Sequence, residues 1–260
     1  MLLRNLRELY QYRALLLSLI QREMKARYRG SALGFLWTFL NPTLLMLVYA
    51  VVFGVYMRQE IPNYTYYMFV GLLPWIWFAT SVGGGASAIS DRRDLLTKVR
   101  FPAQVLPATV VFTNLCNYLL SLPLMLALGF FFQHTPTWHA VAFPLVLLVQ
   151  LMFTLALSYL ISALNVAFRD LQHLVNNFIT LWFFLTPIIY SVKTIPEEIR
   201  TAVVLSNPMA VLVTSYQSIF YAHELPDFGA LGLVTVVSAV LLWLATSIFE
   251  RRREEFAELA

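Results

Sequence analysis

The sequence predicts an all-α integral membrane protein with six membrane-spanning helices, forming a single domain over residues 1–260. Hydrophobic residues make up 59% of the chain and charged residues only 12%, whereas soluble domains carry about 25% charged residues. Residues 101–168 contain no Asp, Glu, Lys or Arg, and this stretch is long enough for two spans of about 20 residues each. An uncharged run of that length does not fit the core of a soluble domain this small.

The N-terminal segment, residues 1–30, predicts an amphipathic helix that lies on the membrane surface. It carries seven of the 18 basic residues of the chain. At helical spacing, one face of this segment is apolar: Leu9, Leu16, Ile20 and Met24. The opposite face is basic: Arg22, Lys25 and Arg29. We expect this interfacial helix to rest its basic face on anionic lipid head groups at the cytoplasmic surface.

Six apolar segments follow, and each predicts a transmembrane helix. They lie at residues 35–57, 64–86, 103–132, 140–164, 171–190 and 228–249. The third is longer than a bilayer requires, and Pro107 and Pro123 within it predict a tilt, a kink or an extension beyond the head groups. Gly30 and Gly34, just before the first span, have the small-xxx-small spacing that permits close helix packing.

The distribution of Lys and Arg predicts that both chain ends lie in the cytoplasm. With this orientation the inner segments contain 15 basic residues, and the outer segments contain three: Arg58, Lys193 and Arg200. Cytoplasmic loops of membrane proteins carry the excess of Lys and Arg. The same count places residues 87–102 in the cytoplasm.

Residues 87–102 form a charged segment between two spans and predict a short cytoplasmic helix over 87–101. Ser90 is expected to cap this helix, and Asp91 and Asp94 in its first turn suit the helix dipole. Pro102 is expected to end it. One edge of the helix is apolar: Leu95, Leu96 and Val99. From these residues alone, a solvated loop helix without a partner remains an alternative.

The connection between spans five and six predicts two short external helices within residues 194–225. Thr194 or Pro196 is suited to start the first, and Asn207 or Pro208 the second. Residues 209–221 are apolar but too short to span, so we expect re-entrant or gate helices. A seventh span would move the basic residues 251–253 to the outside, against the charge count.

The sequence lacks the motifs with which a membrane protein powers transport or catalyses a reaction by itself. It has no P-loop motif for ATP, and its spans contain no clear Asp, Glu, Lys or Arg for coupling to ions. A metal site at His134 and His139 is not favoured, because Pro136 intervenes between them. Ser, His and acidic residues are too scattered to indicate a catalytic site. We therefore expect no cofactor in this chain and an energy input from a partner.

Aromatic residues are the positive functional signal. Span one carries a stripe at i, i+4 and i+7: Tyr49, Phe53 and Tyr56. Span five carries a second group: Trp182, Phe183, Phe184 and Tyr190. Aromatic faces bind the apolar faces of sugar rings, so two facing stripes would line a path for a glycan. The alternative is an interfacial aromatic belt with lipid-facing bulk.

The chain resembles the type-2 ABC exporter permeases that export polysaccharides such as O-antigen, capsule and teichoic acid. The resemblance starts at residues 22–37, REMKARYRGSALGFLW, followed by Asn41-Pro42, and extends over essentially the whole chain. Further matching motifs are GLLPW at 71–75, KVRFP at 98–102, FRD at 168–170, TPIIY at 186–190 and NP at 207–208. Together these motifs are fairly specific for the family, and each alone is weak.

The resemblance implies a half-transporter in the bacterial inner membrane that forms a homodimer and binds two copies of an ATPase subunit holding ATP and Mg. Its substrate would be a lipid-linked glycan, and nucleic acid is not a partner. The coupling helix at 87–101 would contact the ATPase through Arg92, Arg93, Asp94, Leu95, Leu96 and Lys98. The N-terminal helix would contact the ATPase or frame the way in for the substrate through Arg27, Tyr28 and Arg29. The channel would be lined by Tyr49, Phe53, Tyr56, Trp182, Phe183 and Tyr190.

Other classes of protein stay open at this point. A permease of similar architecture could export teichoic acid, a drug or a lipid, because aromatic stripes also suit apolar cargo. A passive channel is a further alternative. A membrane-embedded glycan-processing enzyme would need clustered carboxylates, which the spans lack.

Overall fold

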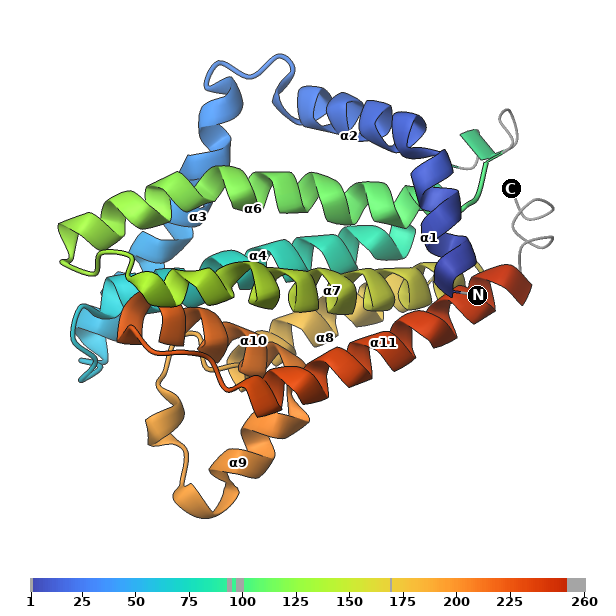
Figure 1. The fold of residues 1–260 in the computed structure, drawn as a ribbon. Coiled ribbons are helices and arrows are strands. Elements are labelled where there is room, and N and C mark those ends of the chain that lie inside the picture. The colour runs from blue at the N-terminus through green and yellow to red at the C-terminus, as the bar shows by residue number, and fades with distance from the viewer. Residues whose placement is uncertain (1, 93–94, 97–100, 169, 252–260) are drawn as a thin grey trace.

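The computed structural model describes residues 2–92, 95–96, 101–168 and 170–251, and within these ranges the chain is helical without any strand. Figure 1 shows the helices gathered in one bundle, with the N-terminal helices crossing one side of it. The all-α membrane fold predicted from the sequence is confirmed. The end of the bundle that holds α1 (Leu2–Gln11), the described parts of connection 88–104 and the end of α11 (Phe228–Arg251) is called the basic end below. The opposite end, with connections 57–63, 132–137 and 223–227, is called the far end.

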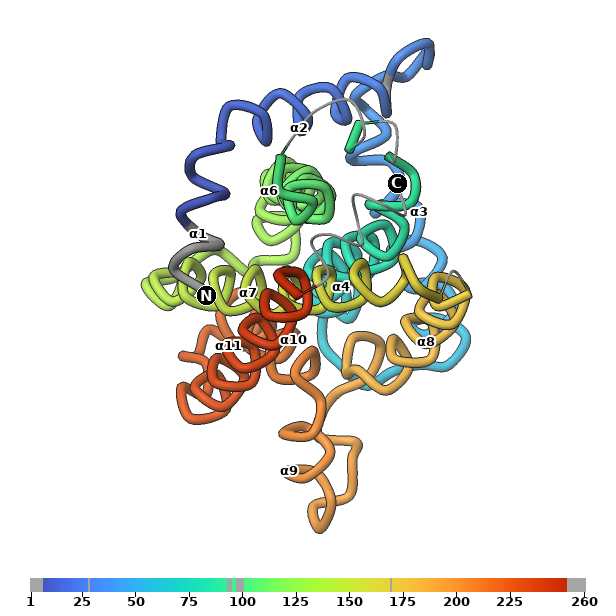
Figure 2. The backbone as a smooth tube through the Cα atoms, turned by 90° about the vertical axis from the view of Figure 1, so that its right-hand side faces the viewer, coloured from blue at the N-terminus to red at the C-terminus, as the bar shows by residue number. Residues whose placement is uncertain are grey.

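The N-terminal segment is two helices, where the sequence predicted one. α1 ends at Gln11, and α2 (Arg13–Tyr28) starts after a break at Tyr12. α2 packs on α6 (Val105–Phe131), and Figure 2 shows it lying across that helix, which is seen end-on. The faces follow the sequence pattern. The inward apolar residues are Leu16, Leu19, Ile20 and Met24, and the exposed basic residues are Arg22, Lys25 and Arg29.

The first span consists of α3 (Trp37–Tyr49) and a continuing π-helical stretch, Ala50–Tyr56, and it follows a short 3-10 turn at Gly34–Leu36. Gly30 and Gly34 have φ angles of +78° and +47°, a conformation that favours glycine. A Cβ atom at either position would meet nothing within 4 Å. The two glycines therefore shape the turn between α2 and α3. The helix packing predicted from their spacing is not found among the described residues.

The centre of the bundle is α4 (Tyr64–Ser87), which contacts α6, α7 (Phe143–Asn165) and α8 (Leu171–Leu185). Three consecutive glycines near its basic end allow these three neighbours to come close. A Cβ atom at Gly83 would lie 2.8 Å from Asn176 of α8, at Gly84 3.2 Å from Val110 of α6, and at Gly85 3.0 Å from Ser158 of α7. Small residues allow close backbone approach, which drives helix association in lipid.

The last span, α11, completes the bundle by packing along α7 in the most extensive helix pairing of the described structure. The third span is a single helix of 27 residues that continues through Pro123. At 1.5 Å per residue it is about 40 Å long, which exceeds the roughly 30 Å hydrocarbon core, as its sequence predicted. A buried polar contact also joins the spans, because Gln150 of α7 donates its Nε2 to the carbonyl of Pro74 at 2.8 Å.

Within the described residues, five helices are long and apolar enough to cross a membrane, or six when a bent pair at 197–222 is taken as one span. The five match predicted spans one to four and six: Gly34–Tyr56, Tyr64–Ser87, Val105–Phe131, Trp138–Asn165 and Phe228–Arg251. The predicted fifth span is wrong at its end. α8 stops at Leu185, because the chain turns extended at Thr186 before Pro187. Its 15 residues give about 22 Å, short of a full crossing.

The connection after α8 holds the two short helices that the sequence predicted. α9 (Glu197–Ser206) and α10 (Pro208–Gln217, continued as a π-helical turn to Ala222) meet at an angle of 104°. Asn207 caps α10, since its side chain accepts a hydrogen bond from the backbone N–H of Ala210 at 3.2 Å. Figures 1 and 2 show α9 projecting away from the bundle, while α10 packs against α4.

Candidate functional site

The connection between α4 and α6 begins with a 3-10 turn at Ser90–Arg92. Ser87, the last residue of α4, donates its hydroxyl to Asp91 Oδ2 at 2.7 Å. The predicted cap at Ser90 is not formed in the described part of the chain, because the Ser90 hydroxyl is buried without a hydrogen-bond partner there. Asp91 is thus held to the end of the central helix.

Arg92 faces the N-terminal helix. Its guanidinium forms an ion pair with Glu23 of α2, and both side chains are about three-quarters buried. The pair lies in a cleft of about 480 Å³ that also includes Arg22, Asp91 and Leu95. Burial, and then the neighbouring charge of Arg22, lower the pKa of Arg92 from its usual value. The ion pair therefore ties the connection after α4 to α2.

Leu95 and Leu96 also face inward. Both are half-buried and pack against the cluster formed by α2 and the start of α6, which includes Leu19, Val105 and Leu106. The apolar edge predicted for this segment is thus directed at the chain's own N-terminal helix. Three other predicted ATPase contacts lie outside the described residues: Arg93, Asp94 and Lys98.

The basic residues at the end of α2 divide between a pocket and the surface. Arg27 is exposed, and its Nη2 donates to Asn114 Oδ1 of α6 at 3.2 Å. Arg29 is exposed on the turn that follows. Tyr28 ends α2, and its side chain lies outside the described part of the structure. The structure thus connects Arg27 to the third span, which the sequence pattern did not indicate.

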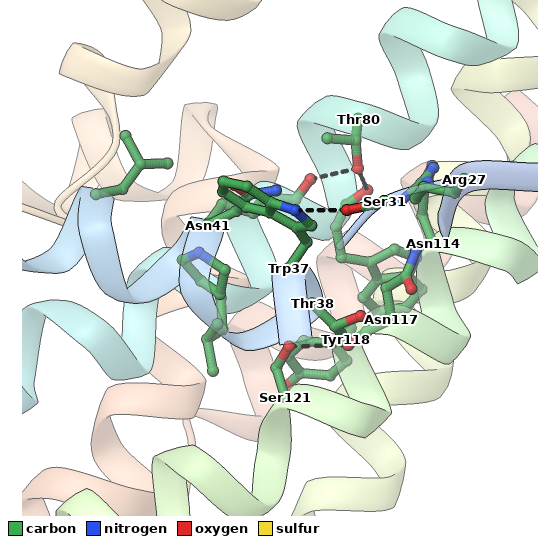
Figure 3. Close-up of a pocket in the computed structure, with 15 residues that line it drawn as sticks. Arg27, Ser31, Trp37, Thr38, Asn41, Thr80, Asn114, Asn117, Tyr118 and Ser121 are labelled. Atoms are coloured by element: carbon green, nitrogen blue, oxygen red, sulfur yellow. Dashed lines mark hydrogen bonds between the residues drawn. The ribbon is translucent and has the colours of Figure 1, made fainter. Parts of the chain in front are cut away.

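Figure 3 shows the pocket beside Arg27, with a volume of about 470 Å³. It lies between α3 and α6, with α4 at its base. Its polar and aromatic lining consists of Arg27, Ser31, Trp37, Thr38, Asn41, Trp77, Thr80, Asn114, Asn117, Tyr118 and Ser121. This pocket was not predicted from the sequence. The available signal was the set of asparagines inside apolar spans, because amides are costly in lipid unless they have partners.

The predicted aromatic stripes on spans one and five meet at one point. The rings of Tyr49 and Phe183 stack with centroids 5.5 Å apart, and Tyr49 also contacts Phe53 edge-on at 6.1 Å. Tyr56, at the end of the stripe, is 75% exposed. Within one chain these rings pack against each other and leave no open channel between them. A channel lined by these rings would therefore need a second copy of the chain to form its other wall. Their lining of a channel stays a prediction.

Trp182 forms a hydrogen bond that was not predicted from the sequence. Its indole N–H donates to Asn207 Oδ1 at 2.8 Å, and Asn207 donates in turn to the carbonyl of Leu185 at 3.1 Å. Its ring packs edge-on against Phe78 of α4 with centroids 5.3 Å apart. Trp182 therefore fixes the start of α10 against the end of α8. Tyr190 lies beyond α8 and its carbonyl accepts a hydrogen bond from the Tyr67 hydroxyl at 3.1 Å.

Three of the four histidines, His134, His139 and His223, lie at the far end, but His134 pairs with His223 and not with His139. His134 stacks on Tyr66, Tyr221 and His223, with centroids 5.2, 4.8 and 5.6 Å away. His139 instead shares a 2.8 Å hydrogen bond with Thr137. Among the described residues no group of three His, Cys, Asp or Glu side chains could hold a metal ion.

These features define a class of protein. The chain is a multi-pass helical membrane protein with a charged connection at its basic end and a bent pair of short helices toward its far end, and its sequence contains no ATP-binding motif. The chain belongs to the ABC-2 type transporter family, whose model matches residues 14–221. It is accordingly a permease, the membrane component of an ABC transporter that carries no ATPase domain and works with an ATPase partner.

Relatives cover almost the whole chain. It is 68% identical over 258 residues to the O-antigen export system permease protein RfbA of Myxococcus xanthus, with 99% of each chain covered. It is 32% identical over 246 residues to the protein of the same description from Klebsiella pneumoniae, with 94% of each chain covered. A more distant relative, at 19% identity over 240 residues, is the polysialic acid transport protein KpsM of Escherichia coli.

Proposed function

We propose that this chain is the permease of an exporter for a lipid-linked, O-antigen-like polysaccharide in the bacterial inner membrane. The observation that carries the proposal is the full-length identity of 68% to an O-antigen export system permease. The facing aromatic residues of α3 and α8 add support, because stacked rings on both helices suit the apolar faces of sugars. Teichoic acid, a drug or another lipid is the alternative cargo for the same architecture.

The basic end faces the cytoplasm in this proposal. Of the three basic residues assigned to the outside, Arg58 lies in the far-end connection 57–63, and Lys193 lines a pocket together with residues 59–62 of that connection. In contrast, α1 and Arg251, the last residue of α11, belong to the basic end. Because the excess of Lys and Arg marks the cytoplasmic side, both chain ends are cytoplasmic. The ATPase then binds at the basic end, where ATP and Mg are held by that partner.

The functional complex contains two copies of this chain and two ATPase subunits. The segment 87–101 serves as the coupling helix, with Arg92, Arg93, Asp94, Leu95, Leu96 and Lys98 in or next to the ATPase contact. Support comes from the attachment of this segment to α2 through the Arg92–Glu23 ion pair and through Leu95. A push on the segment by the ATPase therefore moves α2 together with the start of α6.

The glycan passes along the surface formed by the first span and α8 of both copies. On the single chain much of this surface is exposed and apolar, including Tyr56 and Phe184. Arg27, Tyr28 and Arg29 frame the way in at the head-group level, and the short helices within 194–225 form the gate at the far end. The channel lining consists of Tyr49, Phe53, Tyr56, Trp182, Phe183 and Tyr190.

The test begins with co-purification of the tagged permease and its candidate ATPase, followed by ATP turnover of the ATPase with and without the permease in lipid. We expect a stable complex and turnover that depends on the permease. Export is then measured as the appearance of the lipid-linked glycan on the outer face of vesicles. A permease that purifies alone and leaves ATP turnover unchanged would falsify the exporter assignment.

A further inference from the structure

The pocket in Figure 3 is a polar groove inside an apolar part of the bundle. Three amides converge on it, Asn41 from α3 and Asn114 and Asn117 from α6. Polar groups at membrane depth are costly, and those that occur face a partner, a cavity or a ligand. Most of the side-chain amides of spans one and three line this groove, which indicates that the groove accommodates a polar partner.

Two of its polar groups have room for an additional partner. The Asn41 side chain is exposed, and among the described residues nothing hydrogen-bonds to it. The Arg27 guanidinium is exposed as well, and its partner is the neutral amide of Asn114, with no carboxylate of the described residues in ion-pair range. A guanidinium beside amide donors provides the charge-assisted hydrogen bonds that phosphate oxygens accept.

The rest of the lining suits the apolar part of an amphiphile. The half-exposed Trp37 ring forms one wall, and Pro42 and Leu45 continue the groove along α3. Leu45 lies eight residues beyond Trp37, about 12 Å along the helix. The groove thus runs from a cationic end at Arg27 to an apolar end on α3. Its 470 Å³ falls within the range of small-ligand sites, about 300–1,000 Å³.

We propose that this groove binds the phosphate-bearing head group of a membrane lipid, one molecule for each copy of the chain. The phosphate accepts hydrogen bonds from Arg27 and from the neighbouring amides, and the hydrocarbon chain runs along α3 past Leu45. This chemistry is shared by anionic phospholipids of the bilayer and by polyprenyl diphosphates. The inference does not depend on which polymer the exporter carries.

The test uses the full-length permease in detergent and three probes. These are dioctanoyl phosphatidylglycerol, farnesyl diphosphate, and dioctanoylglycerol, which has the same acyl chains without a phosphate. Bound molecules are counted by native mass spectrometry, and dissociation constants are obtained by titration. We expect both phosphate probes to bind one per chain and at least about tenfold more tightly than dioctanoylglycerol, because the charged hydrogen bonds are absent from the latter.

Arg27→Gln removes the cation and is expected to raise the dissociation constants of both phosphate probes about tenfold. Lys25→Gln is the matched control, because Lys25 is an exposed cation on α2 and is not part of the groove. The affinities of this variant for the probes should stay within about twofold of the wild type. Asn41→Leu is the second variant. Asn41 lines the same groove and is exposed, so its replacement leaves the fold intact and tests the groove even if Arg27→Gln does not fold.

Competition between the probes identifies the source of the lipid. Displacement of phosphatidylglycerol by low concentrations of farnesyl diphosphate supports a site for the prenyl carrier, and resistance to displacement supports a bilayer phospholipid. The proposal is overturned if the phosphate probes bind no better than dioctanoylglycerol. It is also overturned if folded Arg27→Gln or Asn41→Leu binds the phosphate probes like Lys25→Gln.

Discussion

The first and second spans are alike in length and opposite in environment. Span Gly34–Tyr56 has 23 residues and α4 has 24, yet 17% of the most apolar window of the first is buried, against 72% for α4. The more buried helix is the less apolar of the two. Hydrophobicity therefore does not decide which helix lies inside, because lipid tails solvate apolar side chains as well as a protein core does.

The difference lies in which residues permit close approach. α4 places Gly83, Gly84 and Gly85 against three neighbouring helices, and its tyrosine hydroxyls at the far end bond to backbone carbonyls such as that of Ile189. The exposed side of α3 offers large apolar residues, including Leu44, Leu47 and Val48. Such a surface suits lipid or a second copy of the chain, in agreement with the proposed dimer.

The largest expected effect comes from filling a close contact of the buried helix. Gly85→Leu would drive a side chain into Ser158, whose Cβ lies 3.0 Å and whose backbone Cα lies 3.4 Å from a Cβ at position 85. Overpacking costs about 1–3 kcal/mol or more, so we expect loss of monodisperse protein and a lower Tm in detergent. Gly232→Leu is the control, since a Cβ there meets nothing within 4 Å. Equal behaviour of the two variants would contradict the packing argument.

The next effect concerns the attachment of the coupling segment to α2. Glu23→Arg breaks the ion pair with Arg92 and leaves two partly buried cations, at a cost of roughly 1–3 kcal/mol. We expect the permease to lose its effect on ATP turnover of the bound ATPase. The double variant Glu23→Arg/Arg92→Glu restores the pair and should recover that effect. An unrescued double variant would show that the pair is not the link.

The matched control for that link is the ion pair between Glu197 and Arg200 of α9, with N and O atoms 3.7 Å apart and Glu197 largely exposed. Exposed pairs contribute about 0–1 kcal/mol. Glu197→Gln should therefore leave both the Tm and the ATP turnover of the complex close to the wild-type values.

A smaller effect is expected where α8 meets α10. Trp182→Phe keeps an aromatic side chain but removes the indole N–H and with it the 2.8 Å hydrogen bond to Asn207, and loss of this hydrogen bond costs about 1 kcal/mol. The variant should show a modestly lower Tm and faster proteolysis within connection 186–207. Trp243→Phe, at a half-exposed ring on α11, is the comparison and should leave both measurements unchanged.

The smallest effect on stability is expected at the exposed end of the first span. Tyr56→Ala removes a side chain that is 75% exposed, so the free energy of unfolding should change by less than about 0.5 kcal/mol. Export should nevertheless fall if Tyr56 lines the glycan path. Phe131→Ala, 78% exposed at the far end of α6, controls for a general loss of aromatic surface. Unchanged export by Tyr56→Ala would remove this residue from the proposed channel.

The sequence predicted the features that depend on apolar length. Spans one to four and six, the two short helices and the start of α10 at Asn207-Pro208 all follow from hydrophobic runs and from caps. The end of α8 was predicted wrongly because residues 186–190 continue the apolar run of the helix. They lie outside the helix because the backbone is extended at Thr186, a conformation favoured by the following proline and held by hydrogen bonds from Asn207.

The sites were less predictable, because they depend on contacts between distant segments. Arg92 pairs with a residue 69 positions earlier, and Arg27 bonds to Asn114, 87 positions later. Neither contact follows from a periodic sequence pattern, so the spacing of residues along the chain does not predict either one. The stripe on span one was periodic and could be read from the sequence, but its stacking contact with span five at Tyr49 and Phe183 was not predicted. The role of Trp182 as a hydrogen-bond donor depends on the fold of the later connection.

The pairing of α7 with α11 has a consequence for biosynthesis. The 62 residues from 166 to 227 separate the two helices, so at about 5–20 residues per second α7 waits roughly 3–12 s for its main partner to leave the ribosome. During that time the ring of Tyr159, which packs edge-on against Phe249 of α11 with centroids 5.6 Å apart and is fully buried in the finished bundle, lacks this part of its cover. Chains truncated before residue 228 should therefore be substrates for membrane quality-control proteases, whereas chains that extend past residue 251 retain all of α11.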